Sequence, residues 1–295
     1  MDRGTGIGVC RACNVRINWI SMHNNSAEPK VAMHEYKSIR YEIDGHLVRL
    51  TLNRPEMLNA IDDEMHNDLL SVLLEIRGEP EIRAVLFGAE GKAFSAGGDL
   101  NEVASLQADI AKRTRMCETG LRIIHALLDI PVPIVVALHG DAMGLGASIV
   151  LGCDIIVASR SARIADPHVK VGLVAGDGGC LFWPASVGMH RAKRYLLTGD
   201  LMPAEDAWKF GLVTDLVDTP EECLPAARKI AERITGLPPI AVRGTKRSLN
   251  ALLKSRAREA FDLSMAYELQ SGGSEDILEA VKAFKEKRKP VYRNR

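Results

Sequence analysis

His168 and Asp177 are the two residues of this sequence whose types and spacing best fit acid/base chemistry. They lie nine positions apart in "DPHVKVGLVAGDGG", residues 166–179, where most other residues are glycine or small and apolar. An aspartate that is hydrogen-bonded to one imidazole nitrogen fixes the tautomer and directs the other nitrogen toward a substrate. We therefore predict that this pair acts as a general base. The alternative is a structural histidine beside an unrelated turn aspartate.

Two glycine-containing loops could supply backbone donors for the same chemistry. "AFSAGGDL", residues 93–100, and "HGDAMGLGAS", residues 139–148, each follow a strand-like run and precede a helical pattern. Such a transition leaves backbone N–H groups without intrahelical partners. If the two loops face each other, they could form an oxyanion hole. The alternative is that the glycines only permit tight turns.

The elements that would position these loops alternate between strand and helix patterns. Short apolar runs predict strands at residues 46–53, 82–90, 133–140 and 153–159. Apolar residues at helical spacing predict helices at 62–78, 101–130, 145–152, 256–270 and 274–289. This alternation is typical of an α/β fold with helices on the faces of a sheet. We divide the chain into a flexible extension (1–33), an α/β core (34–220) and a helical region (221–295).

Composition sets limits on the protein class. The 38 basic and 38 acidic residues cancel, so the net charge does not favour nucleic acid or an anionic membrane as a partner. No run reaches the roughly 18 apolar residues of a membrane-spanning helix, and the six scattered cysteines fit a reducing compartment. We expect a cytoplasmic protein. No group of His, Cys, Asp and Glu has metal-ligand spacing, so we predict no metal.

Several segments, in the family's order, resemble the enoyl-CoA hydratase/isomerase (crotonase) family. They are "LNRPEMLNAID", "AFSAGGDL", "GLGASIVLGCDIIVAS", "LLTGD" with "AWKFGLV", and "AFKEKRKP", which span about residue 35 to the end. The resemblance implies a repeated ββα spiral with a C-terminal helical region that forms a homotrimer or homohexamer. It also implies an acyl-CoA substrate, with coenzyme A as part of that substrate and no permanently bound cofactor.

Site residues follow from the resemblance. The thioester oxygen would accept hydrogen bonds from the N–H groups of Ala96 and Leu145. The loop residues Ala96, Gly97, Gly98 and Asp99 would face the CoA thioester, and Asp99 would order the turn. Two cations, Arg54 and Lys287, match positions that contact CoA in relatives, although both could instead be solvated surface charges.

The resemblance fails where a hydratase handles protons. Family hydratases carry two glutamates, and the corresponding positions here hold Ser148 and His168. Asp177, nine positions after His168, is similar in spacing to the His/Asp pair of the β-diketone hydrolase branch. The resemblance therefore implies a family enzyme with His168/Asp177 as its acid/base pair.

The reaction itself stays open between hydration, isomerisation, thioester hydrolysis and retro-Claisen C–C hydrolysis. A different class, a non-catalytic acyl-CoA-binding protein, is the competing hypothesis.

Overall fold

The computed structural model describes residues 33–295. The predicted flexible extension, residues 1–33, lies outside the described residues apart from Met33. Residues 33–295 lie in one compact unit. The predicted start of the helical region, residue 221, coincides with the first turn of a helix that begins at Pro220. That helix packs against the sheet.

Seven strands form the main sheet in the order β1-β2-β3-β4-β5-β7-β10. Strands β1 to β3 pair antiparallel, and β3, β4, β5, β7 and β10 pair parallel. A second sheet has the order β6-β8-β9. The strands are β1 Met33–Glu35, β2 Ile39–Asp44, β3 Leu47–Leu52, β4 Ala84–Ala89, β5 Ile134–Leu138, β6 Ala142–Met143, β7 Ile155–Ser159, β8 Arg163–Ala165, β9 Met202–Pro203 and β10 Asp215–Val217.

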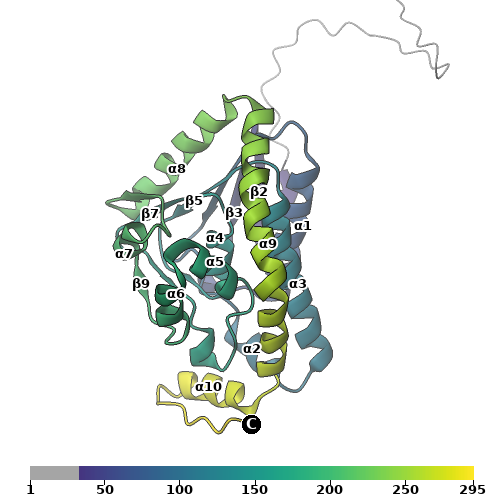
Figure 1. The fold of residues 1–295 in the computed structure, drawn as a ribbon, viewed down its shortest axis with the longest axis vertical. Coiled ribbons are helices and arrows are strands. Elements are labelled where there is room, and N and C mark those ends of the chain that lie inside the picture. The colour runs from purple at the N-terminus through teal and green to yellow at the C-terminus, as the bar shows by residue number, and fades with distance from the viewer. Residues whose placement is uncertain (1–32) are drawn as a thin grey trace, which may run out of the picture. The chain divides into compact units, whose positions relative to one another are not determined.

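Helices cover both faces of the main sheet (Figure 1). They are η1 Pro55–Met57, α1 Asp63–Gly78, α2 Leu100–Ser105, α3 Ile110–Asp129, α4 Leu145–Leu151, η2 His168–Val171, α5 Gly179–Val187, α6 Met189–Leu196, α7 Ala204–Lys209, α8 Pro220–Thr235, α9 Pro239–Ser271 and α10 Glu275–Lys285. Strand β4 shows why both faces are covered. Val85 and Phe87 join the large core with α1 and α3, whereas Leu86 packs with Cys223 and Ala227 of α8.

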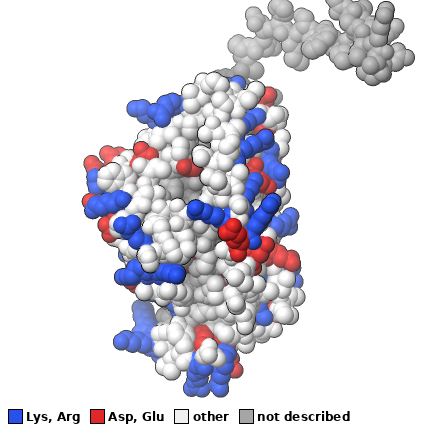
Figure 2. All heavy atoms as spheres, viewed as in Figure 1, with Lys and Arg blue, Asp and Glu red and all other residues white. Residues whose placement is uncertain are grey.

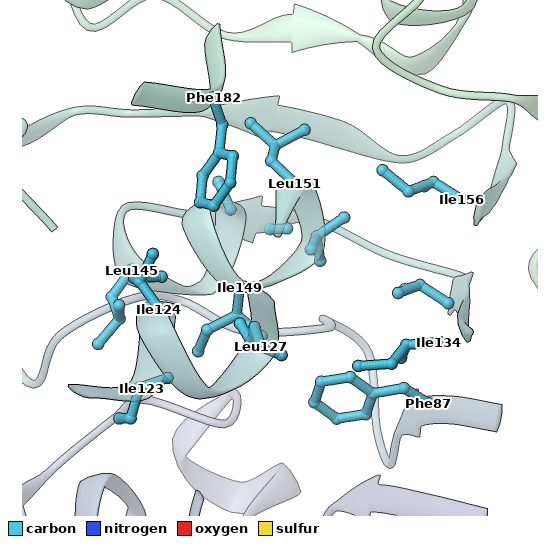
Figure 3. Close-up of a cluster of buried hydrophobic side chains, with 14 of the residues drawn as sticks. Phe87, Ile123, Ile124, Leu127, Ile134, Leu145, Ile149, Leu151, Ile156 and Phe182 are labelled. Carbon is cyan, nitrogen blue, oxygen red and sulfur yellow. The ribbon is translucent and has the colours of Figure 1, made fainter. Parts of the chain in front are cut away.

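Helix α4 is buried along its whole length, and this burial holds its first residue, Leu145, in place. Figure 3 shows Leu145 and Ile149 among the side chains of α3, including Ile123 and Ile124, with Phe182 of α5 on another side. The sequence predicts this helix at 145–152, and the structure confirms it.

Helix α9 is much longer than the sequence pattern predicts. The expected helix covers residues 256–270, but α9 runs over 33 residues from Pro239 to Ser271. Its N-terminal half is fixed by a buried ion pair, in which Nζ of Lys246 lies 2.6 Å from Oδ2 of Asp154 and 2.9 Å from the carbonyl oxygen of Val132. The buried positions in this half of α9 are Lys246 and Asn250, and these polar residues interrupt the apolar periodicity from which the sequence predicts a helix.

The surface carries charges of both signs. Figure 2 shows Lys and Arg side chains interspersed with Asp and Glu side chains on one face. Among the described residues, no helix has the length and apolar character that crossing a membrane requires.

Candidate active site

The loop between β8 and α5 brings His168 and Asp177 together, as the sequence predicts. His168 begins the short helix η2, and Asp177 lies two residues before α5. Nε2 of His168 lies 3.2 Å from Oδ2 of Asp177. Both residues are buried, with 9% and 5% of their surfaces exposed.

A second carboxylate, Asp166, contacts the other ring nitrogen of His168. Nδ1 of His168 forms a short hydrogen bond with Oδ1 of Asp166, whose side chain is almost completely buried. The sequence analysis missed this contact, although Asp166 lies two positions before His168 in the same stretch. The sequence predicts that one ring nitrogen of His168 is free to act on a substrate. This prediction is wrong, because each ring nitrogen faces a carboxylate.

The two carboxylates hold His168 as an imidazolium. Burial alone would lower the pKa of this imidazole, but Asp177 and Asp166 oppose that effect and raise the pKa well above its usual value. Burial would also raise the pKa of Asp177, and His168 and Ser148 instead keep it below its usual range. The site therefore holds a charged histidine between the carboxyl groups of Asp177 and Asp166.

Ser148 acts on the site through Asp177. Its hydroxyl is completely buried in α4 and donates a 3.0 Å hydrogen bond to Oδ1 of Asp177. Each oxygen of the Asp177 carboxylate thus has one side-chain partner. The arrangement makes Ser148 a group that orients Asp177.

The glycines of residues 176–179 allow the loop to pass between these side chains. A Cβ on Gly176 would lie 2.5 Å from Oε2 of Glu268, and one on Gly179 would lie 2.0 Å from Oδ2 of Asp166. Gly178 has a φ of +131°, and a Cβ there would lie 2.9 Å from the Ser148 side chain. Close packing against the ionisable groups therefore explains why this stretch has almost no other side chains.

A small cavity lies beside the His168/Asp177 pair. It leaves about 40 Å³ for the centres of water molecules. Each of the two glycine loops contributes a residue to its lining, Gly98 from the first and Leu145 from the second. The buried titratable residues His66 and Glu268 also line it. This convergence of elements far apart in the sequence marks the cavity as the candidate active site.

The two glycine loops lie in contact, as the oxyanion-hole hypothesis requires. The N–H of Ser95 donates to the carbonyl oxygen of Asp141 (3.1 Å), and the N–H of Met143 donates to that of Ser95 (3.0 Å). Gly97 has a φ of +84°, and a Cβ there would lie 2.7 Å from the carbonyl oxygen of Met143.

The prediction that Ala96 supplies a donor is wrong. Its N–H donates to the carbonyl oxygen of Leu58 at 2.9 Å, so it is not available to a ligand. Gly98 is better placed to donate. The carbonyl oxygen of Gly97 accepts from the N–H of Ile61, and the N–H of Asp99 donates to the carbonyl oxygen of Ile61. The N–H of Gly98, between them, has no acceptor among the described residues. Gly98 also lines the cavity, whereas Ala96 does not.

Leu145 is available as the second donor. It is the first residue of α4, so its N–H has no intrahelical acceptor, and it lines the cavity. The preceding Gly144 lies against His168, since a Cβ on Gly144 would be 3.4 Å from Cε1 of the imidazole. The charged ring is therefore next to the turn that carries the Leu145 donor.

His66 is a second histidine of the site that the sequence analysis missed. Burial lowers its pKa, and Nδ1 donates to the carbonyl oxygen of Asp62 at 3.1 Å. A neutral histidine with its proton on Nδ1 carries a lone pair on Nε2. His66 lies on the buried face of α1 with Leu69, Leu70 and Leu73. A polar residue within that apolar stripe was the available signal.

Glu268 of α9 is the other missed residue. It is 5% exposed, and its Oε2 has no hydrogen-bond partner. Burial, followed by the nearby charge of Asp177, raises the pKa of this carboxyl to about 8. Glu268 thus retains its proton at neutral pH. It shares a helix face with Phe261 and Met265, so its signal was again a polar group within an apolar stripe.

The remaining predicted residues have mixed surroundings. Asp99 caps α2 by accepting from the N–H groups of Asn101 and Glu102, which confirms its role in ordering the turn. Arg54 is ion-paired with Asp62 and donates to the carbonyl oxygen of Ala60 at 3.2 Å. Lys287 is exposed in the C-terminal segment. CoA contact by Arg54 and Lys287 stays a prediction.

Within residues 33–295, one group of side chains could offer metal ligands, although the sequence predicts no metal. Asp166, His168 and Asp177 each have a ligand atom within 4.8 Å of the others. Both nitrogens of His168 already face these carboxylates, whereas Oδ2 of Asp166 is buried without a hydrogen-bond partner among the described residues. The absence of a metal stays a prediction.

Comparison with known proteins decides the family. The family model for enoyl-CoA hydratase/isomerase matches residues 42–295. The chain belongs to this family. It is therefore an enzyme of the crotonase superfamily, and the substrates expected from the family are acyl-CoA thioesters.

Relatives within the enoyl-CoA hydratase/isomerase family have different activities. The short-chain-enoyl-CoA hydratase of Clostridium acetobutylicum is 32% identical over 86% of this chain and 97% of its own length. The 1,2-epoxyphenylacetyl-CoA isomerase of Escherichia coli is also 32% identical, over 85% and 96%. A crystal structure of an enoyl-CoA hydratase/isomerase from Mycobacterium paratuberculosis is 38% identical, covers 83% of this chain and 97% of its own, and has a TM-score of 0.78. These similarities confirm the crotonase fold and leave the reaction open.

Proposed function

We propose that this protein catalyses proton transfer at the carbon next to an acyl-CoA thioester. The carbonyl oxygen would accept hydrogen bonds from the N–H groups of Gly98 and Leu145. The single observation that carries the proposal is the convergence of two uncommitted backbone donors, a neutral histidine and a protonated carboxyl on one cavity. The imidazolium of His168 adds a fixed positive charge beside the oxyanion.

Each proton has an assigned carrier. Nε2 of His66 removes a proton from the α-carbon, and the electron pair of that C–H bond moves onto the thioester oxygen to form an enolate. Collapse of the enolate takes a proton back onto carbon from the carboxylic acid of Glu268. His168 and Asp177 do not transfer a proton in this scheme, because both ring nitrogens of His168 already face carboxylates; His168 contributes its positive charge instead. In this scheme, His66 replaces His168 as the initial base.

Hydrolysis of a carbon–carbon bond in a β-diketone is the second candidate. The observation that favours it is the presence of His66 with a free Nε2, which could take a proton from water. The resulting hydroxide adds to one carbonyl, the bond to the α-carbon breaks, and its electron pair forms an enolate that Glu268 protonates. The same groups serve both reactions, so only substrate choice separates them.

Deuterium exchange tests the proposal. The enzyme in D₂O should incorporate deuterium at the α-carbon of a saturated acyl-CoA, detected by mass spectrometry, and His66→Ala should abolish this incorporation. Crotonyl-CoA hydration should be weak, because Ser148 and His168 replace both hydratase glutamates. Rapid hydration of crotonyl-CoA that survives His168→Ala contradicts the assignment. Acyl-CoA binding without exchange or turnover of either substrate class indicates the non-catalytic binding protein.

A further inference from the structure

The active-site cavity is too small for more than the reacting end of an acyl-CoA. Its free volume of about 40 Å³ for water centres holds a few water molecules. Two apolar side chains close one side of it, Cys117 of α3 and Met265 of α9, which are 7% and 6% exposed. An acyl tail of more than a few carbons must therefore leave this cavity.

A second cavity lies against the same two side chains. Its free volume, measured in the same way, is about 400 Å³, within the range of small-molecule sites. Cys117 and Met265 line both cavities, so these two side chains stand between them. The walls of the outer cavity come from α3 and α9, the two helices that hold Cys117 and Met265.

The lining of the outer cavity suits an alkyl chain. Beyond the shared pair, its uncharged lining consists of the apolar residues Leu121, Ala266 and Leu269 and one hydroxyl residue, Thr114. Its charged members, Glu118, Arg122 and Asp262, are exposed, so they mark the edge that meets solvent. A narrow apolar wall with a charged outer edge accommodates an unbranched hydrocarbon without burying a charge.

Met265 is the side chain best able to open a passage. Methionine has three rotatable side-chain bonds and adapts to irregular apolar space at low cost. Farther along, α3 and α9 are held together by the contact of the His125 and Phe261 rings, whose centroids are 5.7 Å apart. The opening therefore needs a rotation of one side chain, with the helices staying in place.

We infer that the acyl tail of the substrate runs past Met265 into the cavity between α3 and α9, and that the enzyme accepts unbranched acyl groups of medium length. This inference rests on the proposed acyl-CoA function. It assigns a specificity-determining role to Leu121, Ala266 and Leu269, which lie outside the catalytic group.

Binding of saturated acyl-CoA thioesters of four, six, eight and ten carbons tests this inference. Measured by titration calorimetry, affinity should rise about fourfold per added methylene, as expected for burial of a CH₂ group. Ala266→Trp, which fills the outer cavity, should leave four-carbon binding within about twofold and remove the gain for longer chains. Ala260→Trp is the matched control, because Ala260 is also an exposed alanine of α9 but does not line the cavity.

A second variant comes from the opposite wall. Leu121→Phe on α3 should shorten the accepted chain in the same way, independently of any effect of tryptophan on α9. If four-carbon binding is normal but chain length has no effect, or if Ala266→Trp and Leu121→Phe match Ala260→Trp, the channel does not exist. If no acyl-CoA of any length binds, the proposed function itself fails.

Discussion

Oδ2 of Asp177 lies 3.2 Å from Nε2 of His168, and the two residues approach each other across a loop that leaves no space for side chains at Gly176, Gly178 and Gly179. The loop thus fixes the pair sterically. Oδ1 of the same carboxylate accepts a 3.0 Å hydrogen bond from the hydroxyl of Ser148. Ser148 stands where family hydratases have a glutamate, and here it orients Asp177.

Asp177→Asn should reduce kcat/KM about as much as His168→Ala, by roughly 10²–10⁴-fold. The amide removes the negative charge that holds His168 protonated and oriented. Ser148→Ala should cost only about tenfold, because it removes one hydrogen bond to a charged group. Steady-state kinetics on the substrate that the exchange screen identifies measures all three. Equal losses for Ser148→Ala and Asp177→Asn would instead indicate that Ser148 contacts substrate.

Asp166→Asn should lower the pKa of His168 without moving the ring. In the wild type the folded-state pKa is raised, so the stability that protonation of His168 contributes is fully present below 6.5 and is lost as pH rises through the raised value. Nitrogen NMR of labelled histidine should show an imidazolium at pH 7.5 in the wild type. The variant should lose the second ring proton at lower pH, and an unchanged titration would remove Asp166 from the network.

Leu145→Pro should remove an oxyanion donor while keeping α4. Proline is tolerated at the first position of a helix, where the missing N–H has no intrahelical acceptor. The expected loss in kcat is about 10²–10³-fold. Leu145→Ala controls for the lost side chain and should be much milder. Circular dichroism confirms folding, and a folded, fully active Leu145→Pro enzyme would place the donor elsewhere.

Glu268→Gln should change how stability depends on pH. Because the carboxyl has a pKa of about 8 when folded and 4.5 as its ordinary value, the folded state binds the extra proton between these pH values. Wild-type stability should therefore fall as pH rises from 5 to 8, by up to roughly 4 kcal/mol from this group. Urea unfolding at several pH values should show a flatter profile for Glu268→Gln. Parallel profiles would mean that Glu268 is ionised.

The sequence predicts the elements better than it predicts their partners. Strand patterns at 46–53, 82–90, 133–140 and 153–159 match β3, β4, β5 and β7, because each run is buried by helices on the sheet. The pair His168 and Asp177 was also recognisable, since both lie in one short loop.

Residues from distant helices could not be found in this way. His66 and Glu268 reach the cavity from α1 and α9, and each looks like an exception in an apolar stripe until the helices are packed together. Ala96 was assigned by motif position, but which N–H of the loop is free depends on the hydrogen bonds to Leu58 and Ile61. Those bonds follow from tertiary contacts that composition and spacing do not encode.

Helix α9 has a consequence for how mutations in this enzyme are interpreted. Its outer surface exposes Leu249, Leu252, Leu263 and Tyr267, while its inner surface carries Met265 and Glu268 into the cavity. Because both surfaces belong to one helix, its rotation about the helix axis fixes the direction in which both face. The ion pair of Lys246 with Asp154 holds the helix in place. A rotation of this helix about its axis would turn the acid of the site and the methionine together, so a substitution on the exposed surface that rotates α9 would also change the cavity.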